Sequence, residues 1–293
     1  MLRLVKAELY KLFKNKTFKV LCGVAIFLSA LWIVLASPLL EQITMDSMGD
    51  MSIEEKEAMV SQLTSLSAGE DVFIPGQMGV KLNAKDPMNP TALEVYHSSF
   101  GSGLIEILIG VLIGAFMAKE YTEGTIKNTL AYGKKRYEFY IAKFLALVVG
   151  IVILEVCLTL IGTVGTTIIN GWGQTFEIAQ LVGMAESFVA GVIANSAVAA
   201  VLMIIAILVK GNGATIGITV AIFILLPSIT GFLYGVYPWF DNLYELTPFY
   251  NSALATSIYS SGGDIMKSIV VALGTIAISL LAGIQILKAQ DIK

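Results

Sequence analysis

The sequence predicts an all-α membrane protein with six transmembrane helices and both termini in the cytoplasm. Of its 293 residues, 56% are hydrophobic and only 14% are charged, whereas about one quarter of the residues in soluble domains are charged. The hydrophobic residues are gathered into six stretches, each close to the roughly 20 helical residues that a bilayer core of about 30 Å requires. These stretches are residues 19–36, 98–117, 142–169, 188–209, 214–234 and 268–287.

Basic residues predict the orientation in the membrane. Of the 19 Lys and Arg residues, 15 precede the first stretch, border the segment between the second and third, or lie at the remaining ends on that side. The other side holds only Lys56, Lys81, Lys85 and Lys267, and its first loop, residues 37–97, carries ten acidic residues. Because cytoplasmic loops are enriched in Lys and Arg, the basic side is predicted to be cytoplasmic.

Composition argues against several other classes of function. The formal net charge of −3 and the pI near 5.3 do not indicate a nucleic-acid partner. Cys22 and Cys157 lie within apolar stretches and are predicted to be small buried side chains, with no role in a disulfide or metal site. His97 is the single histidine and is expected at the outer membrane interface. No metal or cofactor is therefore predicted in this chain.

Residues 1–18 predict an amphipathic helix in the plane of the lipid headgroups. Its basic residues would be attracted to anionic lipid, and the apolar residues of one helical face are Leu2, Val5, Leu9, Leu12 and Phe13. A simple cluster of charges that sets the topology is the alternative. The residues Val34-Leu35-Ala36 resemble a signal-peptide cleavage site. The long charged region before them and the five later stretches favour a first helix that is retained.

The outer loop, residues 37–97, is predicted to form a small extracytoplasmic cap. Ser52 and Glu55 have the spacing of a capping box, so a helix is expected to begin there. The apolar face of this helix would comprise Ile53, Val60, Leu63 and Leu66. Glycine and proline residues then follow and break regular structure.

The inner loop, residues 118–141, is predicted to carry a short helix. Gly124 ends the preceding helix, Thr125 can cap a new helix over residues 126–131, and Gly133 ends it. A short helix at the tip of a cytoplasmic loop would allow a partner protein to push on the membrane segments. An ordinary charged connector is the alternative that the pattern leaves open.

Two acidic residues are predicted near the middle of the membrane. Glu106 and Glu155 each lie roughly 16–18 Å from the inner ends of their helices. A charged group at this depth costs several kcal/mol unless it is protonated, paired or hydrated. We therefore expect both to line a polar translocation pathway, or to form a structural hydrogen bond between helices, with Asn195 as a candidate partner.

The segment at residues 235–267 is rich in aromatic residues on the outer side. Pro227 is predicted to interrupt the fifth span, while Pro238 and Pro248 predict short broken helices that dip back toward the membrane. Tyr237, Trp239 and Phe240 lie among these aromatic residues. They could form an interfacial aromatic belt, which requires no further function.

The inner loop also carries a resemblance to a known family. The residues concerned are Glu120, the run Gly124-Thr125-Ile126-Lys127, Leu130, Arg136 and Lys143. This set is similar to the first cytoplasmic loop of ABC-2 type permeases, and the resemblance covers essentially the whole chain. It is greatest to bacterial permeases that export bacitracin, lantibiotics and phenol-soluble modulin peptides. The resemblance implies a multi-pass protein of the bacterial plasma membrane that exports amphipathic peptides.

The resemblance also implies roles for particular residues. The inner loop would form a coupling helix that docks on an ATP-binding subunit, with Glu120 and Gly124 to Lys127 at or near that contact. Leu130 and Arg136 belong to the same loop. A re-entrant segment containing Pro227, Tyr237, Trp239 and Phe240 would form an outer gate.

The chain is not predicted to be its own motor or an enzyme. It contains no G-x-x-x-x-G-K-[ST] phosphate-binding loop, because the pair Gly133-Lys134 lacks the upstream glycine. ATP and Mg²⁺ would be bound by a separate P-loop ATPase subunit. A single set of six spans also implies a second permease copy, as a homodimer or a heterodimer. The G-x-x-x-G motifs that begin at Gly110 and Gly213 could permit close helix contacts.

Two other classes of function are weighed against the exporter. An intramembrane enzyme would need a Ser/His, paired-Asp or His-metal set of residues within the spans, and the sequence shows none. A membrane sensor or immunity protein would bind its ligand through the outer loop without transport. A neighbouring gene for a P-loop ATPase would favour the exporter over the sensor.

Overall fold

The described part of the chain folds into helices. The computed structural model describes residues 1–35, 37–67, 84, 86, 89–100, 103–126, 135–173 and 175–290. The helices of the N-terminal half are α1 (Leu2–Lys14), α2 (Lys16–Leu35), α3 (Pro38–Ser47), α4 (Ile53–Ser67), α5 (Ala92–Ser98), α6 (Leu104–Ile113), the π-helix η1 (Gly114–Ala118) and α7 (Lys119–Thr122). The others are α9 (Arg136–Ile169), α10 (Ile178–Val209), α11 (Asn212–Leu233), α12 (Pro238–Tyr244), α13 (Pro248–Ala255) and α14 (Gly262–Ala289).

Five of the described helices are long and apolar enough to cross a membrane: α2, α9, α10, α11 and α14. The prediction of an all-helical, multi-pass protein is therefore confirmed. The stretch predicted as the second span, residues 98–117, is not one continuous helix. Helix α5 ends at Ser98, and α6 begins after Gly103, whose φ of +68° is a conformation that glycine adopts readily. From Leu104 the chain then continues through α6, η1 and α7 to Thr122.

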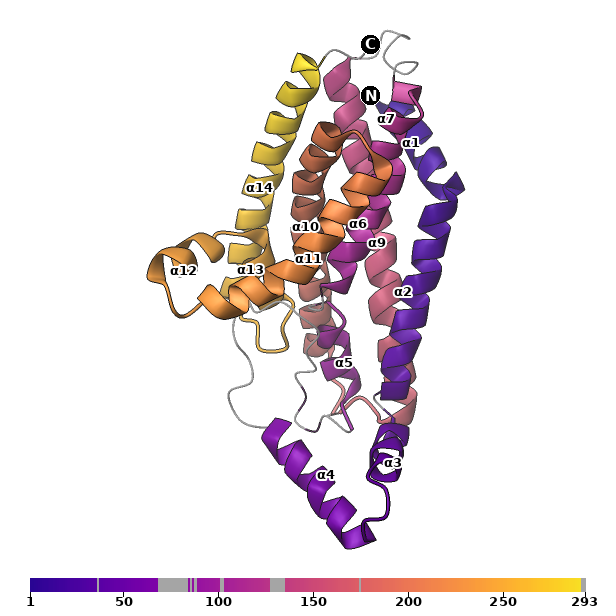
Figure 1. Cartoon of the computed structure of the whole chain (residues 1–293), viewed down its shortest axis with the longest axis vertical. Coiled ribbons are helices and arrows are strands. Elements are labelled where there is room, and N and C mark those ends of the chain that lie inside the picture. Colours follow the sequence, from indigo (N-terminus) through magenta and orange to yellow (C-terminus); the bar gives the residue numbers. More distant parts are fainter. Residues whose placement is uncertain are drawn as a thin grey trace.

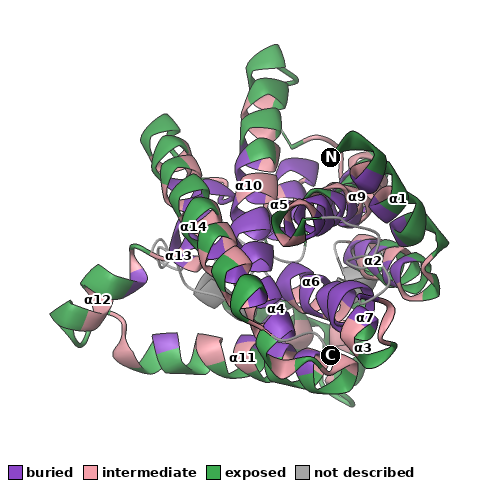
Figure 2. Cartoon of the chain, turned by 90° about the horizontal axis from the view of Figure 1, so that it is seen from above, coloured by how far each residue is buried: buried purple, intermediate pink, exposed green. Residues whose placement is uncertain are grey.

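The helices form an elongated bundle with the start of α1 and the end of α14 at the same end (Figure 1). We call this the terminal end, and α3 and α4 lie at the opposite end. Helices α9 and α10 have 34 and 32 residues, so each is about 50 Å long and exceeds the thickness of a bilayer core. Helix α6 and the inward faces of α9 and α10 are buried, whereas α11 and α14 expose much of their surface (Figure 2).

Helix α2 packs against α9 through small residues. The Ser29 hydroxyl donates a hydrogen bond to the Leu158 carbonyl at 2.6 Å and accepts one from the Gly162 amide at 2.7 Å. A Cβ atom at Gly162 would come within 3.3 Å of the Ser29 carbonyl, and one at Gly165 would overlap the Ile33 side chain. The two glycines therefore let the first span lie directly against α9.

Helix α6 packs against α11 through the Gly110 and Gly114 motif. A Cβ at Gly110 would overlap the Thr219 side chain, and one at Gly114 would overlap Ile216. This motif is therefore used for packing within the chain. Its sequence pattern had suggested contact with a second copy, for which it is not available. Around Gly213 and Gly217 of α11, by contrast, an added Cβ would meet no atom within 4 Å.

Replacing Gly110 by valine should lower the free energy of unfolding by about 1–3 kcal/mol, because the new side chain must displace Thr219 from a close helix contact. Thermal or denaturant unfolding of the detergent-solubilised protein would measure the effect. Gly23→Val is the matched control on an open face of α2, with an expected change of less than about 1 kcal/mol. Equal effects of the two substitutions would contradict the assigned α6–α11 packing.

Pro227 does not end the fifth span, so the predicted interruption is wrong. Helix α11 runs from Asn212 to Leu233 with Pro227 inside it. The Thr230 hydroxyl donates a hydrogen bond to the Pro227 carbonyl at 3.0 Å. Proline removes one backbone donor, which helices packed in membrane proteins can tolerate. Pro238 and Pro248 instead lie at the first positions of the short helices α12 and α13, where proline is favoured.

The predicted capping box at Ser52 is confirmed. The Ser52 amide donates to Glu55 Oε2 at 3.0 Å, the Glu55 amide donates to Ser52 Oγ at 3.3 Å, and α4 follows. These hydrogen bonds to the charged form lower the pKa of Glu55 below its ordinary value. Of the predicted apolar face, Val60 is buried and Ile53 is exposed, and the side chains of Leu63 and Leu66 lie outside the described part.

The N-terminal helix uses its apolar residues mainly for contact with the rest of the protein. Helix α1 ends at Lys14 with Asn15 as its C-cap, and α2 begins at Lys16, a little before the predicted start of the span. Leu4 and Leu12 are buried in the main core, whereas Leu2 and Phe13 are exposed. Helix α1 contacts α9 along this buried face, so only part of the predicted lipid-facing surface is free to meet lipid.

Candidate functional site

A cluster of four charged side chains lies near the terminal end, centred on Lys143 of α9. The Lys143 ammonium forms ion pairs with Glu8 Oε2 at 2.6 Å and Glu120 Oε1 at 2.8 Å. It also donates a hydrogen bond to the Phe116 carbonyl at 3.0 Å. Lys11 completes the cluster, with its ammonium 2.8 Å from Glu8 Oε1 and 3.0 Å from Glu120 Oε1. We call these four residues the ion cluster.

Each member of the ion cluster comes from a different turn or helix. Glu8 and Lys11 lie one turn apart on α1, Glu120 lies on α7, and Lys143 lies on α9. The π-helix η1 contributes Phe116, whose ring is 3.8 Å from the Lys143 ammonium and whose carbonyl faces it. A single turn of π-helix within an α-helical segment often marks a functional position. The cluster thus joins α1 and α9 to the helix that leads into the inner loop.

The ion cluster is balanced in charge and largely shielded from water. The side chains of Lys143 and Glu8 are 0% exposed, and that of Glu120 is 11% exposed. Two cations face two carboxylates, so the cluster as a whole is neutral, with Lys11 as its most exposed member at 42%. Partial burial disfavours the charged form of Lys11, but its hydrogen bond to Glu8 and the charge of Glu120 outweigh this and raise the pKa of Lys11 above its ordinary value.

A cleft of about 660 Å³ opens beside the ion cluster. The junction of α1 and α2 forms one wall, and η1 with α7 forms the other. Its lining residues are Tyr10, Lys11, Lys14, Asn15, Lys16, Thr17, Ala115, Phe116, Lys119, Glu120, Glu123 and Thr125. Asn15 fixes the junction, because its side chain accepts from the Thr17 amide at 2.8 Å and donates to the Ala115 carbonyl at 3.2 Å. The cleft therefore brings a basic surface next to the inner loop.

The residues predicted for the coupling loop occupy different places. Glu120 belongs to the ion cluster, and Ile126 is buried in the main core. Gly124 follows α7 with a φ of +68°, where helix α7 ends as predicted. Thr125 lines the cleft. Lys127, Leu130 and most of the predicted helix over residues 126–131 lie outside the described residues.

Arg136 holds the end of the last helix. Its guanidinium donates to the carbonyls of Leu287 at 2.6 Å, Lys288 at 3.1 Å and Gln290 at 2.7 Å. A cation at this position satisfies the carbonyls that every helix leaves free at its C-terminal end. Arg136 therefore ties the start of α9 to the end of α14.

Glu155 and Asn195 meet inside the bundle, as the sequence suggested they could. The Asn195 amide donates to Glu155 Oε1 at 2.8 Å and links α9 to α10. Both side chains are buried, and the second carboxyl oxygen of Glu155 has no hydrogen-bond partner among the described residues. Glu106 of α6 is also buried.

The aromatic segment is divided between a packed cluster and an exposed helix. Tyr234, Tyr244 and Tyr250 have ring centroids within 5.7 Å of one another, and Phe240 stacks on Tyr244. Trp239 is 63% exposed and Tyr237 is also exposed. Helix α12, which carries Trp239, projects from the side of the bundle (Figure 1).

Comparison with known families identifies the architecture. The sequence matches the ABC-2 family transporter protein profile over residues 56–227, which is more than half of the chain. The chain belongs to the ABC-2 transporter family. No curated protein matches its sequence. The match includes α6, η1, α7 and α9, and therefore Glu120 and Lys143 of the ion cluster.

Membership of the ABC-2 family makes this chain a membrane permease subunit of an ABC transporter, a class that typically works with an ATPase subunit. Sequence reasoning gave Glu8 no role, and it used Lys143 only for the topology and for the family resemblance. Glu8 is the single acid within α1, and Lys143 lies just inside the start of a predicted span, where a charge is costly unless it is paired. The position of each residue indicates that its charge is paired within the protein, but the sequence does not identify the oppositely charged partner.

Proposed function

We propose that the chain is the permease subunit of an ATP-driven exporter that moves amphipathic peptides out of a bacterial cell. A separate P-loop ATPase, which binds ATP and Mg²⁺, supplies the energy. The chain crosses the plasma membrane six times, with α6, η1 and α7 forming the second crossing and both termini in the cytoplasm. The ion cluster is the observation that carries this proposal.

The ion cluster provides a rigid connection between the inner loop and the membrane-spanning helices. Glu120 lies on α7, directly before the loop, and pairs with Lys143 on the long helix α9 and Lys11 on α1. Buried, hydrogen-bonded ion pairs fix geometry more strongly than exposed ones, because neither partner can exchange freely with water. A displacement of the loop by an ATPase would therefore move α7, α1 and α9 together.

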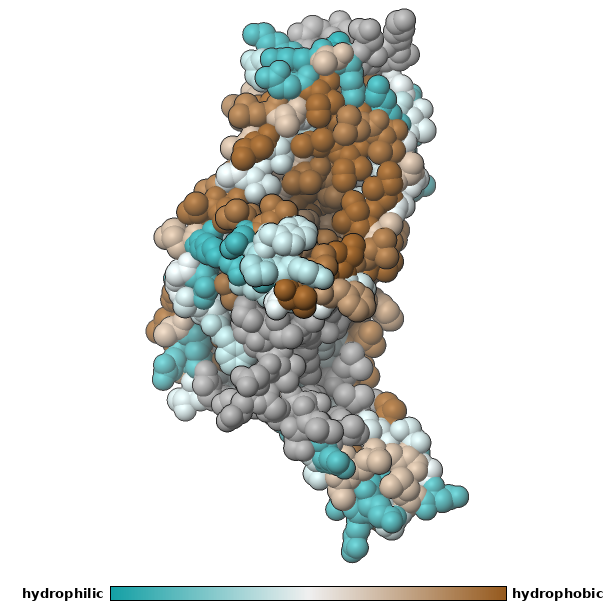
Figure 3. Space-filling model, turned by 60° about the vertical axis from the view of Figure 1, so that its left-hand side comes forward, coloured by the Kyte–Doolittle hydropathy of each residue, from teal (hydrophilic) through white to brown (hydrophobic). Residues whose placement is uncertain are grey.

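The surface of the bundle supports the proposed topology. A continuous apolar surface lies below a hydrophilic cap at the terminal end (Figure 3). The start of α1 and the end of α14 lie at that same end (Figure 1), which supports an even number of crossings, with α6, η1 and α7 as the proposed sixth. The Lys-rich cleft at this end agrees with a cytoplasmic position.

The translocation pathway is proposed to pass the level of Glu106, Glu155 and Asn195. These residues provide polar groups inside an otherwise apolar bundle. Pro227 and the aromatic residues Tyr237, Trp239 and Phe240 are proposed to belong to the outer gate, with residues 235–267 re-entering the membrane. The alternative of a sensor or immunity protein would retain ligand binding without export.

A second permease copy is proposed to pack on the exposed faces of α11 and α14. Only 17% of the most apolar 18-residue window in each of these helices is buried within the chain. Gly213 and Gly217 lie on an open face of α11, which would allow another helix to approach closely. The partner would be an identical chain or a homologous permease.

Gly124→Pro is expected to abolish co-purification with the ATPase and the ATPase activity that the permease stimulates. Gly124 has a φ of +68°, whereas proline requires a φ near −65°, so the loop cannot leave α7 in its present direction. Pull-down of the tagged complex and phosphate release would measure both effects. Gly49→Pro is the matched control, because Gly49 also has a positive φ but lies between α3 and α4 at the opposite end. Unchanged association in Gly124→Pro would refute the role of the loop.

A further inference from the structure

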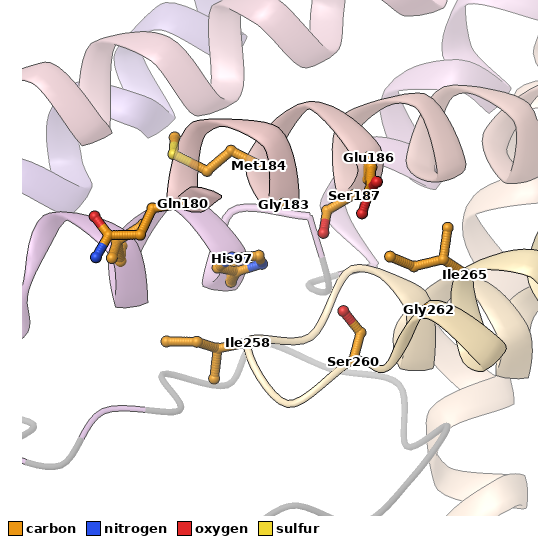
Figure 4. A pocket seen from close by; sticks show the side chains of 11 residues that line it. His97, Gln180, Gly183, Met184, Glu186, Ser187, Ile258, Ser260, Gly262 and Ile265 are labelled. Atoms are coloured by element: carbon orange, nitrogen blue, oxygen red, sulfur yellow. The ribbon is translucent and has the colours of Figure 1, made fainter. Parts of the chain in front are cut away.

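A separate pocket of about 240 Å³ lies between α5, the start of α10 and the loop before α14. It is distant from the ion cluster and involves neither Glu106 nor Glu155. Figure 4 shows His97, Ser187 and Ser260 around its centre, with the two serine hydroxyls directed toward the space between the helices. Apolar side chains complete the walls, among them Leu93, Met184, Ile258 and Ile265.

The walls of this pocket are held in place by hydrogen bonds between the elements. The Tyr96 hydroxyl donates to the Met184 carbonyl at 2.7 Å, which joins α5 to α10. His97 Nδ1 lies 3.0 Å from the Thr256 carbonyl, which joins α5 to the end of α13. A capping box between Ser261 and Asp264 begins α14. The pocket is therefore formed in the folded chain before any ligand arrives.

His97 presents a hydrogen-bond acceptor. A carbonyl oxygen can only accept, so the hydrogen between His97 and Thr256 must lie on Nδ1, and Nε2 of the neutral ring is then unprotonated. Burial lowers the pKa of His97 below its ordinary value, although the contact with the Thr256 carbonyl opposes this. Burial thus favours the neutral imidazole.

The remaining polar groups also favour a ligand that donates hydrogen bonds and carries positive charge. Among the described lining residues, Glu186 is the single charged one, and none of them is Lys or Arg. The amide of Gln180 is already used, because it accepts from Trp172 and donates to the Thr175 carbonyl. The nearby Lys267 lies over the Tyr250 ring at 5.7 Å. Ser187 is buried, and its hydroxyl can accept as well as donate.

We propose that this pocket binds a primary ammonium group on a short alkyl chain, such as the side chain of lysine. The carboxylate of Glu186, Nε2 of His97 and the Ser187 hydroxyl would receive its three hydrogens, while the apolar walls contact the alkyl chain. A cavity of about 150 Å³ can hold benzene, so 240 Å³ is sufficient for such a group. The assignment does not depend on ATP hydrolysis or on the direction of transport.

Binding of n-butylammonium to the purified full-length protein tests this site. The neutral n-butanol and the anionic butyrate have the same chain length and serve as ligand controls. Ligand-dependent thermal stabilisation gives an apparent Kd for each. We expect n-butylammonium to bind most tightly, and Glu186→Gln to weaken it about tenfold. Ser187→Ala should weaken it by a smaller factor.

Glu57→Gln is the matched control, since it removes the same charge from an exposed position on α4 outside the pocket. It should leave the apparent Kd unchanged. Equal binding of n-butanol and n-butylammonium, or an unchanged Kd in Glu186→Gln, would overturn the proposal. Phosphatidylethanolamine carries the same ammonium group. Its competition with n-butylammonium would assign the site to a lipid headgroup, and its failure to compete would assign it to a soluble amine.

Discussion

Lys143→Met is expected to lower the free energy of unfolding by about 3–5 kcal/mol, because it leaves two buried carboxylates without their shared cation. Methionine keeps the length of the side chain, so the apolar contacts with Phe116 and Phe139 remain possible. Lys11 would still contact both carboxylates, but from a position that is 42% exposed. Thermal or denaturant unfolding in detergent would measure the loss.

Two further variants separate the buried charge from other effects of removing a lysine. Lys119→Met removes a half-exposed ammonium that pairs with Glu123 at 3.4 Å, and it should change stability by less than about 1 kcal/mol. Combining Lys143→Met with Glu8→Gln and Glu120→Gln should recover much of the stability, because neutral amides are less costly to bury than unpaired carboxylates. If Lys143→Met were as mild as Lys119→Met, the ion cluster would not be a stabilising core element.

The sequence was sufficient to predict the class of fold, since hydropathy reports directly on contact with lipid. Local signals were also informative, as the Ser52 capping box and the starts of α12 and α13 at Pro238 and Pro248 show. Pro227 was misread because a helix can retain a proline when its neighbours supply packing. The break between α5 and α6 was missed because the run Ser98-Ser99-Phe100-Gly101-Ser102-Gly103, a serine- and glycine-rich signal of a break, was counted as part of the span.

The site depended on contacts that sequence separation conceals. Glu8, Glu120 and Lys143 are far apart along the chain and meet only because α1, α7 and α9 converge. The resemblance predicted Glu120 at or near a docking surface, which stays a prediction, but it did not indicate that the Glu120 side chain pairs with Lys143. Similarly, the glycine pattern at Gly110 and Gly114 indicated a close helix contact but could not identify α11 as the partner. Partner identity is a tertiary property that local patterns do not contain.

Glu155→Leu is expected to destabilise the protein and to reduce export to background. The substitution removes the acceptor of the Asn195 amide at 2.8 Å, and a buried donor without a partner costs about 1–3 kcal/mol. Glu155→Gln keeps an oxygen in place for Asn195, so it should remain close to the parent in stability. Unfolding measurements and peptide export from proteoliposomes that contain the ATPase complex would follow the two properties separately.

Removal of both polar partners distinguishes a transport role from a structural hydrogen bond. Glu155→Leu combined with Asn195→Leu leaves no unpaired donor between α9 and α10, so much of the stability should return. If the polar level lines the translocation pathway, this stable double variant should still fail to export peptide, although it should retain its ATPase. If Glu155 is only structural, export should return together with stability. Normal export by a variant with leucine at both Glu106 and Glu155 would refute the pathway assignment, because no carboxyl group would then remain at this depth.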